Sequence, residues 1–361
     1  MAIYYVTTAG SDSNSGTEAN PFLTISKAWD RSGDGDTIIV NDSGIYTVVE
    51  GGANQLTTGP GKLKTGITIK AGDGCSPVLD GGGTATYAFR CWDSWTVQGL
   101  TFRNFDDGTT NGTGAVVKQY YSHNDGFIYD CVFHDITGAA VDLQKTGTRV
   151  ERNKIYNLWC HAAITVGLGT DNHVKNNIIY NTSGRAIYGT RATVEHNTVY
   201  NCPRQNHYQT NESFRLYSVY GKYVRYNIVE AANVRISAVR AQGGESRYNC
   251  VTGTYDAREL GTPDNYYNNT LGTGDIELSP QFTDKNNANF ILSTGSPCLQ
   301  AAHTSSTPLD QQKFSRNWNY DEKIFGHNTQ QNPEMGALEK HPARIMGVDT
   351  FVVSKVLGAS G

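Results

Sequence analysis

The chain repeats the stretch VERNKIYN, residues 150–157, with different filler between the copies. The pattern returns as VKNNIIYNT at 174–182, VEHNTVYN at 194–201 and VRYNIV at 224–229, with an asparagine three residues after each valine. A short phrase that recurs between variable insertions is typical of a solenoid, in which each repeat forms one coil. The sequence therefore predicts a stack of coils.

The position of the repeated asparagine can be followed along most of the chain. It falls successively on Leu100, Cys131, Asn153, Asn177, Asn197, Asn227, Asn249 and Asn269. The shortest intervals, of 20 to 24 residues, suit a coil of three short strands with alternating apolar residues. An inward asparagine can hydrogen-bond to its copies in the coils above and below, which satisfies a buried polar group. We predict a structural ladder at Asn153, Asn177, Asn197, Asn227, Asn249 and Asn269.

The composition also favours strands and turns. Among 361 residues there are 39 glycines and 21 tyrosines, and only 18% of residues are charged. A net charge of -4 gives no basic field for nucleic acid, and no apolar run is long enough to span a bilayer. Seven cysteines lie far apart without a C-x-x-C pair, so we expect buried, reduced thiols and no metal site.

Three stretches make the chain resemble right-handed parallel β-helix proteins of the pectate-lyase-like superfamily. These are the N-terminal entry at 4–40 with a short helix at about 22–31, the ladder coils at about 65–272, and a closing coil at 279–302 with 334–339. The resemblance implies an all-β, single-stranded right-handed parallel β-helix. We expect an N-terminal strand and capping helix at 1–40, the β-helix at 41–339 and a C-terminal extension at 340–361.

Ligand sites on such helices are expected on an outward face, so we aligned the strand that follows each ladder turn. With Phe89, Val117, Val141, Ile164, Ile187, Leu216 and Ile236 inward, the next residue of each strand faces outward. The predicted outward row is Arg90, Lys118, Asp142, Thr165, Tyr188, Tyr217 and Ser237. A neighbouring outward row is Ala88, Val116, Ala140, Ala163, Ala186, Arg215 and Arg235.

One part of this face has the residues of a glycan-binding surface. Tyrosine rings stack on sugars, and arginine offers a planar fork to the carboxylates of acidic sugars. The predicted binding residues are Tyr188, Tyr217, Arg215, Arg235, His207 and Tyr208. The structural alternative is that exposed tyrosines and arginines only stack on one another and prevent edge pairing.

The other part offers candidates for β-elimination, which needs a base and a cation that holds the developing enolate. Lys118 beside Asp142, with Arg90 one coil away, forms one candidate group, and His161 forms a second with Tyr188 and Arg215. A structural ion pair between Lys118 and Asp142 is the alternative. Hydrolysis needs two carboxylates, and this face has only Asp142, so a lyase is favoured over a hydrolase. We expect no cofactor. Calcium stays open, although no acidic cluster supports it.

The two ends of the chain bear on its setting. The start, MAIYYVTTAGSDS, lacks the basic and apolar regions of a secretion signal, and the apolar run IMGVDTFVVSKVL at 345–357 is suited to assembly. We therefore expect a virion-associated protein (tailspike, fibre or head decoration) that binds surface glycans, as a trimer or virion part assembled through 340–361. The alternatives are a polysaccharide lyase acting on uronate glycans and a bacterial surface adhesin. The expected location is a virion surface or the extracellular space.

Overall fold

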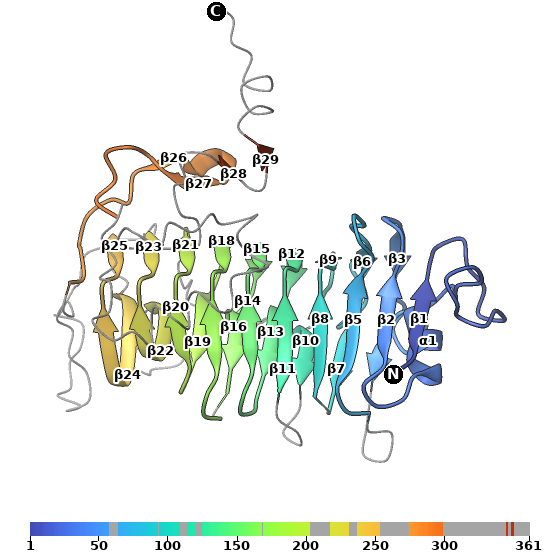
Figure 1. Cartoon of the computed structure of the whole chain (residues 1–361). Helices are drawn as coiled ribbons and strands as arrows, with labels where there is room; N and C mark the ends of the chain where they lie inside the picture. The colour runs from blue at the N-terminus through green and yellow to red at the C-terminus, as the bar shows by residue number, and fades with distance from the viewer. Residues whose placement is uncertain are drawn as a thin grey trace, which may run out of the picture.

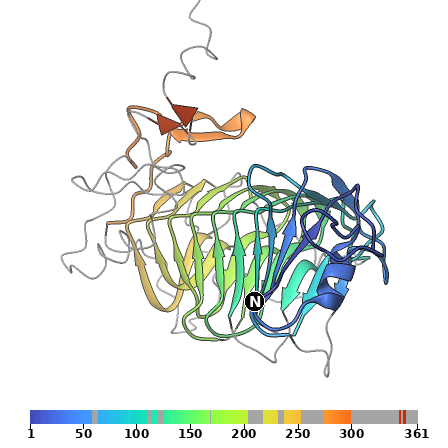
Figure 2. The ribbon, with the colours of Figure 1, turned by 45° about the vertical axis from the view of Figure 1, so that its right-hand side comes forward.

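The computed structural model describes residues 1–57, 64–92, 94–108, 114–119, 125–167, 169–202, 217–230, 237–252, 274–298, 344–345 and 348–349. Over most of this length the chain winds into coils of three short strands, and equivalent strands of successive coils pair in parallel (Figure 1). The view in Figure 2 shows the same coils stacked along one axis. The predicted all-β solenoid is confirmed.

Each coil passes through three faces. The first face leads into the ladder position and consists of β1 (Ile3–Val6), β2 (Thr37–Val40), β5 (Ile67–Ala71), β8 (Trp95–Gln98), β11 (Gly126–Tyr129), β14 (Arg149–Glu151), β17 (His173–Lys175) and β20 (Thr193–Glu195). The second face is a nine-stranded sheet of β3 (Ile45–Thr47), β6 (Val78–Asp80), β9 (Thr101–Arg103), β12 (Val132–Thr137), β15 (Lys154–Trp159), β18 (Ile178–Thr182), β21 (Thr198–Tyr200), β23 (Ile228–Glu230) and β25 (Cys250–Thr252).

The third face consists of β4 (Leu56–Thr57), β7 (Phe89–Cys91), β10 (Ala115–Gln119), β13 (Ala139–Leu143), β16 (Ala162–Val166) and β19 (Arg185–Gly189). Two long strands, β22 (Tyr217–Arg225) and β24 (Ser237–Arg247), continue from the third face into the first face of the next coil. Because β22 pairs with both β19 and β20, the two faces join there into one sheet.

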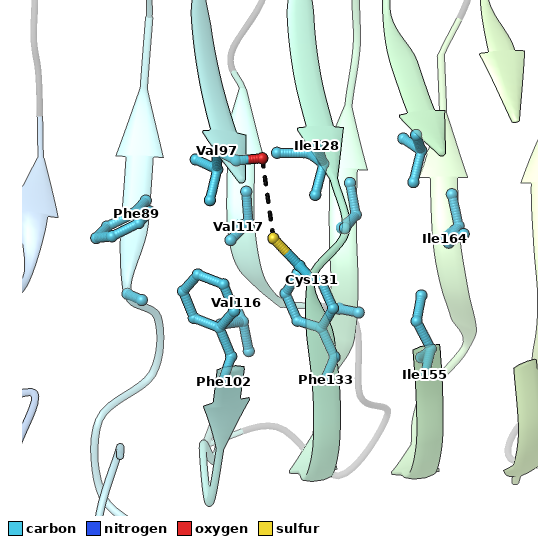
Figure 3. Packing of buried hydrophobic residues seen from close by; sticks show 14 of the residues in the cluster. Phe89, Val97, Phe102, Val116, Val117, Ile128, Cys131, Phe133, Ile155 and Ile164 are labelled. Carbon is cyan, nitrogen blue, oxygen red and sulfur yellow. Dashed lines mark hydrogen bonds between the residues drawn. The ribbon is translucent and has the colours of Figure 1, made fainter. Parts of the chain in front are cut away.

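The core is built from columns of like side chains. On the third face Phe89, Val117, Val141, Ile164 and Ile187 are fully buried and follow one another in register, as the alternating pattern predicts (Figure 3). Burying one such apolar side chain contributes about 1.5–3 kcal/mol. Each coil therefore stabilises its neighbours through residues that are distant along the chain.

Phenylalanine rings pack inside the coils near the N-terminal half. The rings of Phe102 and Phe133 stack with centroids 4.8 Å apart and planes 8° apart. In the same region the Cys131 thiol donates a weak hydrogen bond to the Val97 carbonyl at 3.8 Å (Figure 3). Burial raises the pKa of Cys131 to about 12, so this thiol stays protonated and packs as a small apolar group.

The asparagine ladder is confirmed from Asn153 to Asn249. In each step the side-chain amide of one asparagine donates to the carbonyl oxygen of the next, at 3.0 Å from Asn153 to Asn177 and 2.9 Å from Asn177 to Asn197. The steps to Asn227 and Asn249 are 3.0 Å each. Because all five side chains are buried, these bonds satisfy groups that would otherwise cost about 1–3 kcal/mol apiece.

The last predicted member of the ladder is wrong. Asn249 donates through its backbone and side-chain nitrogens to the Asp275 carboxylate, at 2.7 and 3.1 Å. Asp275 therefore occupies the position assigned to Asn269, which lies outside the described residues. A carboxylate can accept both bonds as an asparagine carbonyl does, so the ladder ends on a different residue type.

A left-handed residue precedes each ladder asparagine and makes the corner tight. Arg152, Asn176, His196 and Tyr226 have φ angles between 54° and 59°. Non-glycine residues are uncommon in this region. The repeated corner keeps successive coils in register, so outward side chains also line up in columns.

The N-terminal end is closed by the short helix α1 (Ile25–Arg31), within the predicted segment (Figure 2). Thr24 caps it by accepting a hydrogen bond from the Lys27 amide at 3.1 Å, which satisfies one free donor of the first turn. Ile25, Ala28 and Trp29 are buried against the first coils. The helix thus covers apolar groups that the first coil would leave exposed.

Residues 279–298 do not form the predicted closing coil. They contain β26 (Phe282–Asp284), the 3-10 helix η2 (Lys285–Asn287) and β27 (Asn289–Leu292), with β26 and β27 antiparallel. The Phe290 ring lies 5.1 Å from that of Tyr180 and 5.7 Å from that of Tyr200, so the hairpin packs on the second face. The alternating apolar residues of this segment therefore pack on the outside of the second face and do not fill the interior of a coil.

The C-terminal extension at 340–361 lies mostly outside the described residues. Within it, the structure describes only the backbone of β28 (Arg344–Ile345) and β29 (Val348–Asp349), which pair antiparallel.

Candidate functional site

The predicted outward row of the third face is confirmed from Arg90 to Tyr188. Lys118 pairs with Arg90 on one side and with Asp142 on the other, and the row continues through Thr165 to Tyr188. All other positions of β10, β16 and β19 are buried, so one column of side chains is partly exposed on this face, with Asp142 itself buried within it. Adjacent parallel strands lie about 4.8 Å apart, so these side chains are close neighbours.

Beyond Tyr188 the predicted alignment is wrong by three residues. The register pairs Ile187 with Val219 and Tyr188 with Tyr220, whereas Tyr217 pairs with Ser237. The rings of Tyr188 and Tyr220 stack with centroids 5.2 Å apart. The long insertion before β22 contains several alternating stretches, so alternation alone left the register open. The shared pattern AIYG at 186–189 and SVYG at 218–221 could have identified it.

The predicted neighbouring outward row is buried instead. Ala88, Val116, Ala140, Ala163 and Ala186 are each no more than 1% exposed and belong to the hydrophobic core. They lie where the chain turns from the second face to the third, and small side chains fit inside that corner. Arg215 and Arg235, assigned to the same row, lie outside the described residues.

Lys118 and Asp142 form an ion pair at the centre of the row. Lys118 Nζ lies 3.2 Å from Asp142 Oδ2, and Gln144 Nε2 donates to Asp142 Oδ1. The Asp142 side chain is only 12% exposed. Burial raises its pKa above the ordinary value even though Lys118 and Gln144 act in the opposite direction. The carboxylate is thus a stronger base than an exposed aspartate.

Arg90 is held beside this pair by an aromatic ring. Its guanidinium carbon lies 3.6 Å from the Tyr87 ring centroid, and the Tyr87 hydroxyl is 2.6 Å from Thr57 Oγ1. Among the described residues, Arg90 Nε is buried without a hydrogen-bond partner. The charge of Arg90 also acts on the Glu50 carboxylate. Burial acts to raise the pKa of Glu50, but hydrogen bonds from Thr86 and Gln55, together with the charge of Arg90, lower this pKa overall.

His161 lies with Tyr188 in a second cluster, as predicted, and the structure adds Arg185. The His161 and Tyr188 ring centroids are 6.4 Å apart, and Arg185 Nη1 lies 3.4 Å from His161 Nε2. Arg185 also lies 5.0 Å from the Tyr188 ring centroid. Arg185 was missed because it begins β19, at a position where the other strands carry alanine.

The structure does not describe the side chains of the remaining predicted binding residues. His207 and Tyr208 lie in the segment 203–216, outside the described residues, and Tyr217 is described only as part of β22.

The described residues do not fit a calcium site. Over the ranges with side chains, no group of three or more histidines, cysteines, aspartates or glutamates lies together. The single carboxylate of this face already has Lys118 and Gln144 as partners, so we derive no step through a metal ion.

Comparison with known proteins agrees with this architecture. The family model described as "Pel9A-like, right handed beta helix region" matches residues 4–164, and the model "Right handed beta helix region" matches residues 87–257. Both matches agree with the coils of the structure, so the chain is a right-handed parallel β-helix protein, and the Pel9A-like region that it matches spans residues 4–164. This confirms the resemblance drawn from its sequence.

Three solved structures show how distant the similar proteins are. A rhamnogalacturonan lyase is 16% identical with a TM-score of 0.41, covering 70% of this chain and 69% of its own. Pectate lyase Pel9A is 12% identical with a TM-score of 0.46, covering 94% and 97%. XylC in complex with xylose is 14% identical with a TM-score of 0.45, covering 70% and 69%. No curated protein sequence matches the chain.

No helix among the described residues is long and apolar enough to span a membrane.

Proposed function

We propose that the protein binds an acidic polysaccharide along the outward row of the third face. The observation that carries the proposal is that Arg90, Lys118 and Asp142 follow one another in register. Two cations therefore lie along the same row as one carboxylate, which pairs with Lys118. The guanidinium of Arg90 and the ammonium of Lys118 are groups that pair with a sugar carboxylate. Further along the row, Thr165 and Tyr188 supply a hydroxyl and an aromatic ring for neighbouring sugar units.

β-Elimination at the same place is a second candidate, and the raised pKa of Asp142 favours it. A uronate carboxylate that pairs with Arg90 and Lys118 would bring its α-proton toward the Asp142 carboxylate. Asp142 would accept that proton, and the two cations would stabilise the enolate that develops. The electron pair then forms the new double bond as the glycosidic oxygen leaves.

Binding is tested by titrating the protein with polygalacturonate, alginate and chondroitin sulfate in a calorimeter. Lys118→Ala is expected to weaken binding about tenfold or more, because it removes a charge that contacts the ligand. Lys70→Ala is the matched control, since Lys70 faces outward on the first face. Equal affinity for both variants would remove the third face as the binding site.

Elimination is tested by following the absorbance of unsaturated uronate with the same polymers. If the protein is a lyase, Asp142→Asn is expected to lower the rate by about 100-fold or more, the loss typical of a general base. Binding without any rise in absorbance would leave the binding proposal intact and remove the lyase.

The biological setting is a separate proposal that comes from the sequence. We infer a virion-associated role, with assembly as a trimer or larger particle through residues 340–361, over a bacterial adhesin. A chain that lacks 340–361 is expected to fold as a monomer, and native mass measurement of both chains compares them. An unchanged oligomeric state would contradict the assembly role.

A further inference from the structure

A hollow in the surface lies where β15 and β18 end. It has a volume of about 400 Å³, within the range of small-ligand sites. The described residues that line it are Leu158 and Thr182 at its base and Asn157, Trp159, Asn181, Ser183 and Asn201 around them. None of these side chains is ionisable, so the hollow differs in chemistry from the face that carries Lys118 and Asp142.

Trp159 is the large apolar group of this hollow. It is 43% exposed, although a side chain of this size is usually well buried. It ends β15, paired with Thr137 of the previous coil, and Leu158 beside it is buried. An exposed indole next to polar amides is suited to stacking on a ring that is apolar on one side and rich in hydroxyls at its edge.

Three asparagines form a column beside the tryptophan, one from each of three successive coils. Asn157, Asn181 and Asn201 have φ angles of 57°, 54° and 48°, and Asn157 and Asn181 are exposed. This backbone conformation interrupts the regular alternation inside β15 and β18, so that the exposed Asn157 and Asn181 are each followed by a buried residue. Asparagine tolerates the left-handed region better than most residues, so the same side chain recurs at the same corner.

The hydrogen bonds within the column leave amide groups open toward a ligand. Asn201 Nδ2 donates to Asn181 Oδ1 at 2.8 Å, and Asn157 Nδ2 donates to Asp135 Oδ1 at 3.1 Å. Among the described residues, Asn181 Nδ2 and Asn201 Oδ1 make no hydrogen bond. One donor and one acceptor on adjacent coils match the hydroxyl groups of a sugar.

The corner that carries the hollow is tightly held. A side chain at Gly184 would place its Cβ 2.0 Å from the Cys160 carbonyl oxygen, so only glycine lets the two turns approach so closely. Ser183 Oγ accepts from the Cys160 amide at 2.9 Å. The hollow is thus preformed. Trp159 also lies two residues before His161, so the hollow adjoins the cluster of His161, Arg185 and Tyr188 along the chain.

We propose that this hollow is a subsite for a neutral pyranose unit, with the Trp159 ring stacked on the sugar and the Asn181 and Asn201 amides bonded to its hydroxyls. The inference rests on the proposed function in taking the ligand to be carbohydrate. It narrows the substrate class to a heteropolysaccharide in which neutral units accompany acidic ones. The uncharged lining contacts the neutral unit, and the outward row of the third face contacts the acidic one.

The experiment titrates the full chain with cellohexaose, xylohexaose and β-1,4-linked galactohexaose, by calorimetry and tryptophan fluorescence. At least one of these neutral probes is expected to bind and to change the fluorescence. Trp159→Ala is expected to weaken that binding about tenfold or more, and Trp159→Phe to weaken it less, since it keeps a ring. Binding of polygalacturonate to a preparation of Trp159→Ala checks the acidic site separately.

A second pair of variants tests the amides without disturbing the backbone. Asn181→Gly keeps a residue that accepts the left-handed conformation and removes the amide. Asn104→Gly is the matched control, because Asn104 is exposed, has a φ of 55° and bonds to Asp80 away from the hollow. Asn181→Gly is expected to weaken neutral-sugar binding several-fold, and Asn104→Gly to leave it unchanged.

Two results would overturn the subsite. One is the absence of binding by all three neutral probes. The other is equal affinity in the wild type, Trp159→Ala and Asn181→Gly. Either result leaves the acidic site untouched if Lys118→Ala still weakens polygalacturonate binding. Conversely, neutral binding that depends on Trp159, with acidic binding indifferent to Lys118, would keep the subsite and remove the proposed function.

Discussion

Two buried carboxylates on different faces of the β-helix have opposite pKa shifts. On the first face, Glu195 lies between Lys175 and Arg225, paired with both in register, and its contact with Lys175 Nζ is 2.9 Å. Burial acts to raise the pKa of Glu195, but the two cations lower it to about 2. On the third face, Lys118 is the one cationic partner of Asp142 among the described residues, and burial raises the pKa of Asp142.

The difference shows how one architecture gives two buried carboxylates opposite pKa shifts. Stacking puts every outward residue next to one neighbour above and one below. At Glu195 two cationic neighbours outweigh the cost of burial, whereas at Asp142 the one cationic neighbour does not. Glu195 therefore stays ionised at any ordinary pH, whereas Asp142 takes up a proton at a higher pH than an exposed aspartate does.

The largest expected effect is on stability, from Glu195→Gln. Removing the carboxylate leaves Lys175 and Arg225, each 29% exposed, without the buried partner that they share, so we expect a loss of about 3–5 kcal/mol in the free energy of unfolding at pH 7. Urea unfolding measures it. Because the pKa of Glu195 is lowered on folding, its contribution is present above the unfolded value of about 4.5 and is lost as the pH falls toward 2.

The control for this prediction is Glu18→Gln, at an exposed position. It should change the unfolding free energy by less than about 0.5 kcal/mol. A loss for Glu195→Gln that is as small as the control's, or that does not shrink at low pH, would show that the two cations do not outweigh the burial of this carboxylate.

A smaller effect is expected when Asp142 receives a second cation. Thr165 is its in-register neighbour on the other side, so Thr165→Lys reproduces the arrangement around Glu195. The pKa of Asp142 is expected to fall from its raised value, and the acid limb of any elimination activity to move to lower pH with it. Carboxyl NMR titration of aspartate-labelled protein measures the shift, and Thr165→Met controls for size. Equal pKa values of Asp142 in the two variants would show that a second neighbouring cation does not lower the pKa of this carboxyl group.

The smallest effect is expected for Asp142→Asn. Since folding raises the pKa of Asp142, the carboxyl group destabilises the fold progressively as the pH rises through that raised value. The asparagine variant is therefore expected to gain stability relative to wild type between pH 4 and pH 8, while staying within about 1 kcal/mol of it. Thermal unfolding across this range measures the trend. A relative loss at pH 8 would mean that Asp142 stabilises the fold as an ion pair.

Local repetition explains which features could be predicted. The valine and asparagine pattern identified the coils, the ladder from Asn153 to Asn249 and the inward column of the third face, because each is repeated at short intervals. The outward row was predicted up to Tyr188 for the same reason. Prediction failed after insertions. Tyr220 takes the place in the outward row that was assigned to Tyr217, and Asp275 takes the place in the ladder that was assigned to Asn269.

The linear order of residues was sufficient for the coil, its buried valines and its asparagine corner, since these depend on neighbours within one repeat. The balance of charge around Asp142 and Glu195, the place of Arg185 beside His161, and the hollow at Trp159 depend on which coils lie next to each other. Contacts between residues 20 or more positions apart set them, and insertions of irregular length hide that spacing from any local pattern. The coils share one repeated sequence pattern, and the way they stack decides which outward side chains become neighbours on each face.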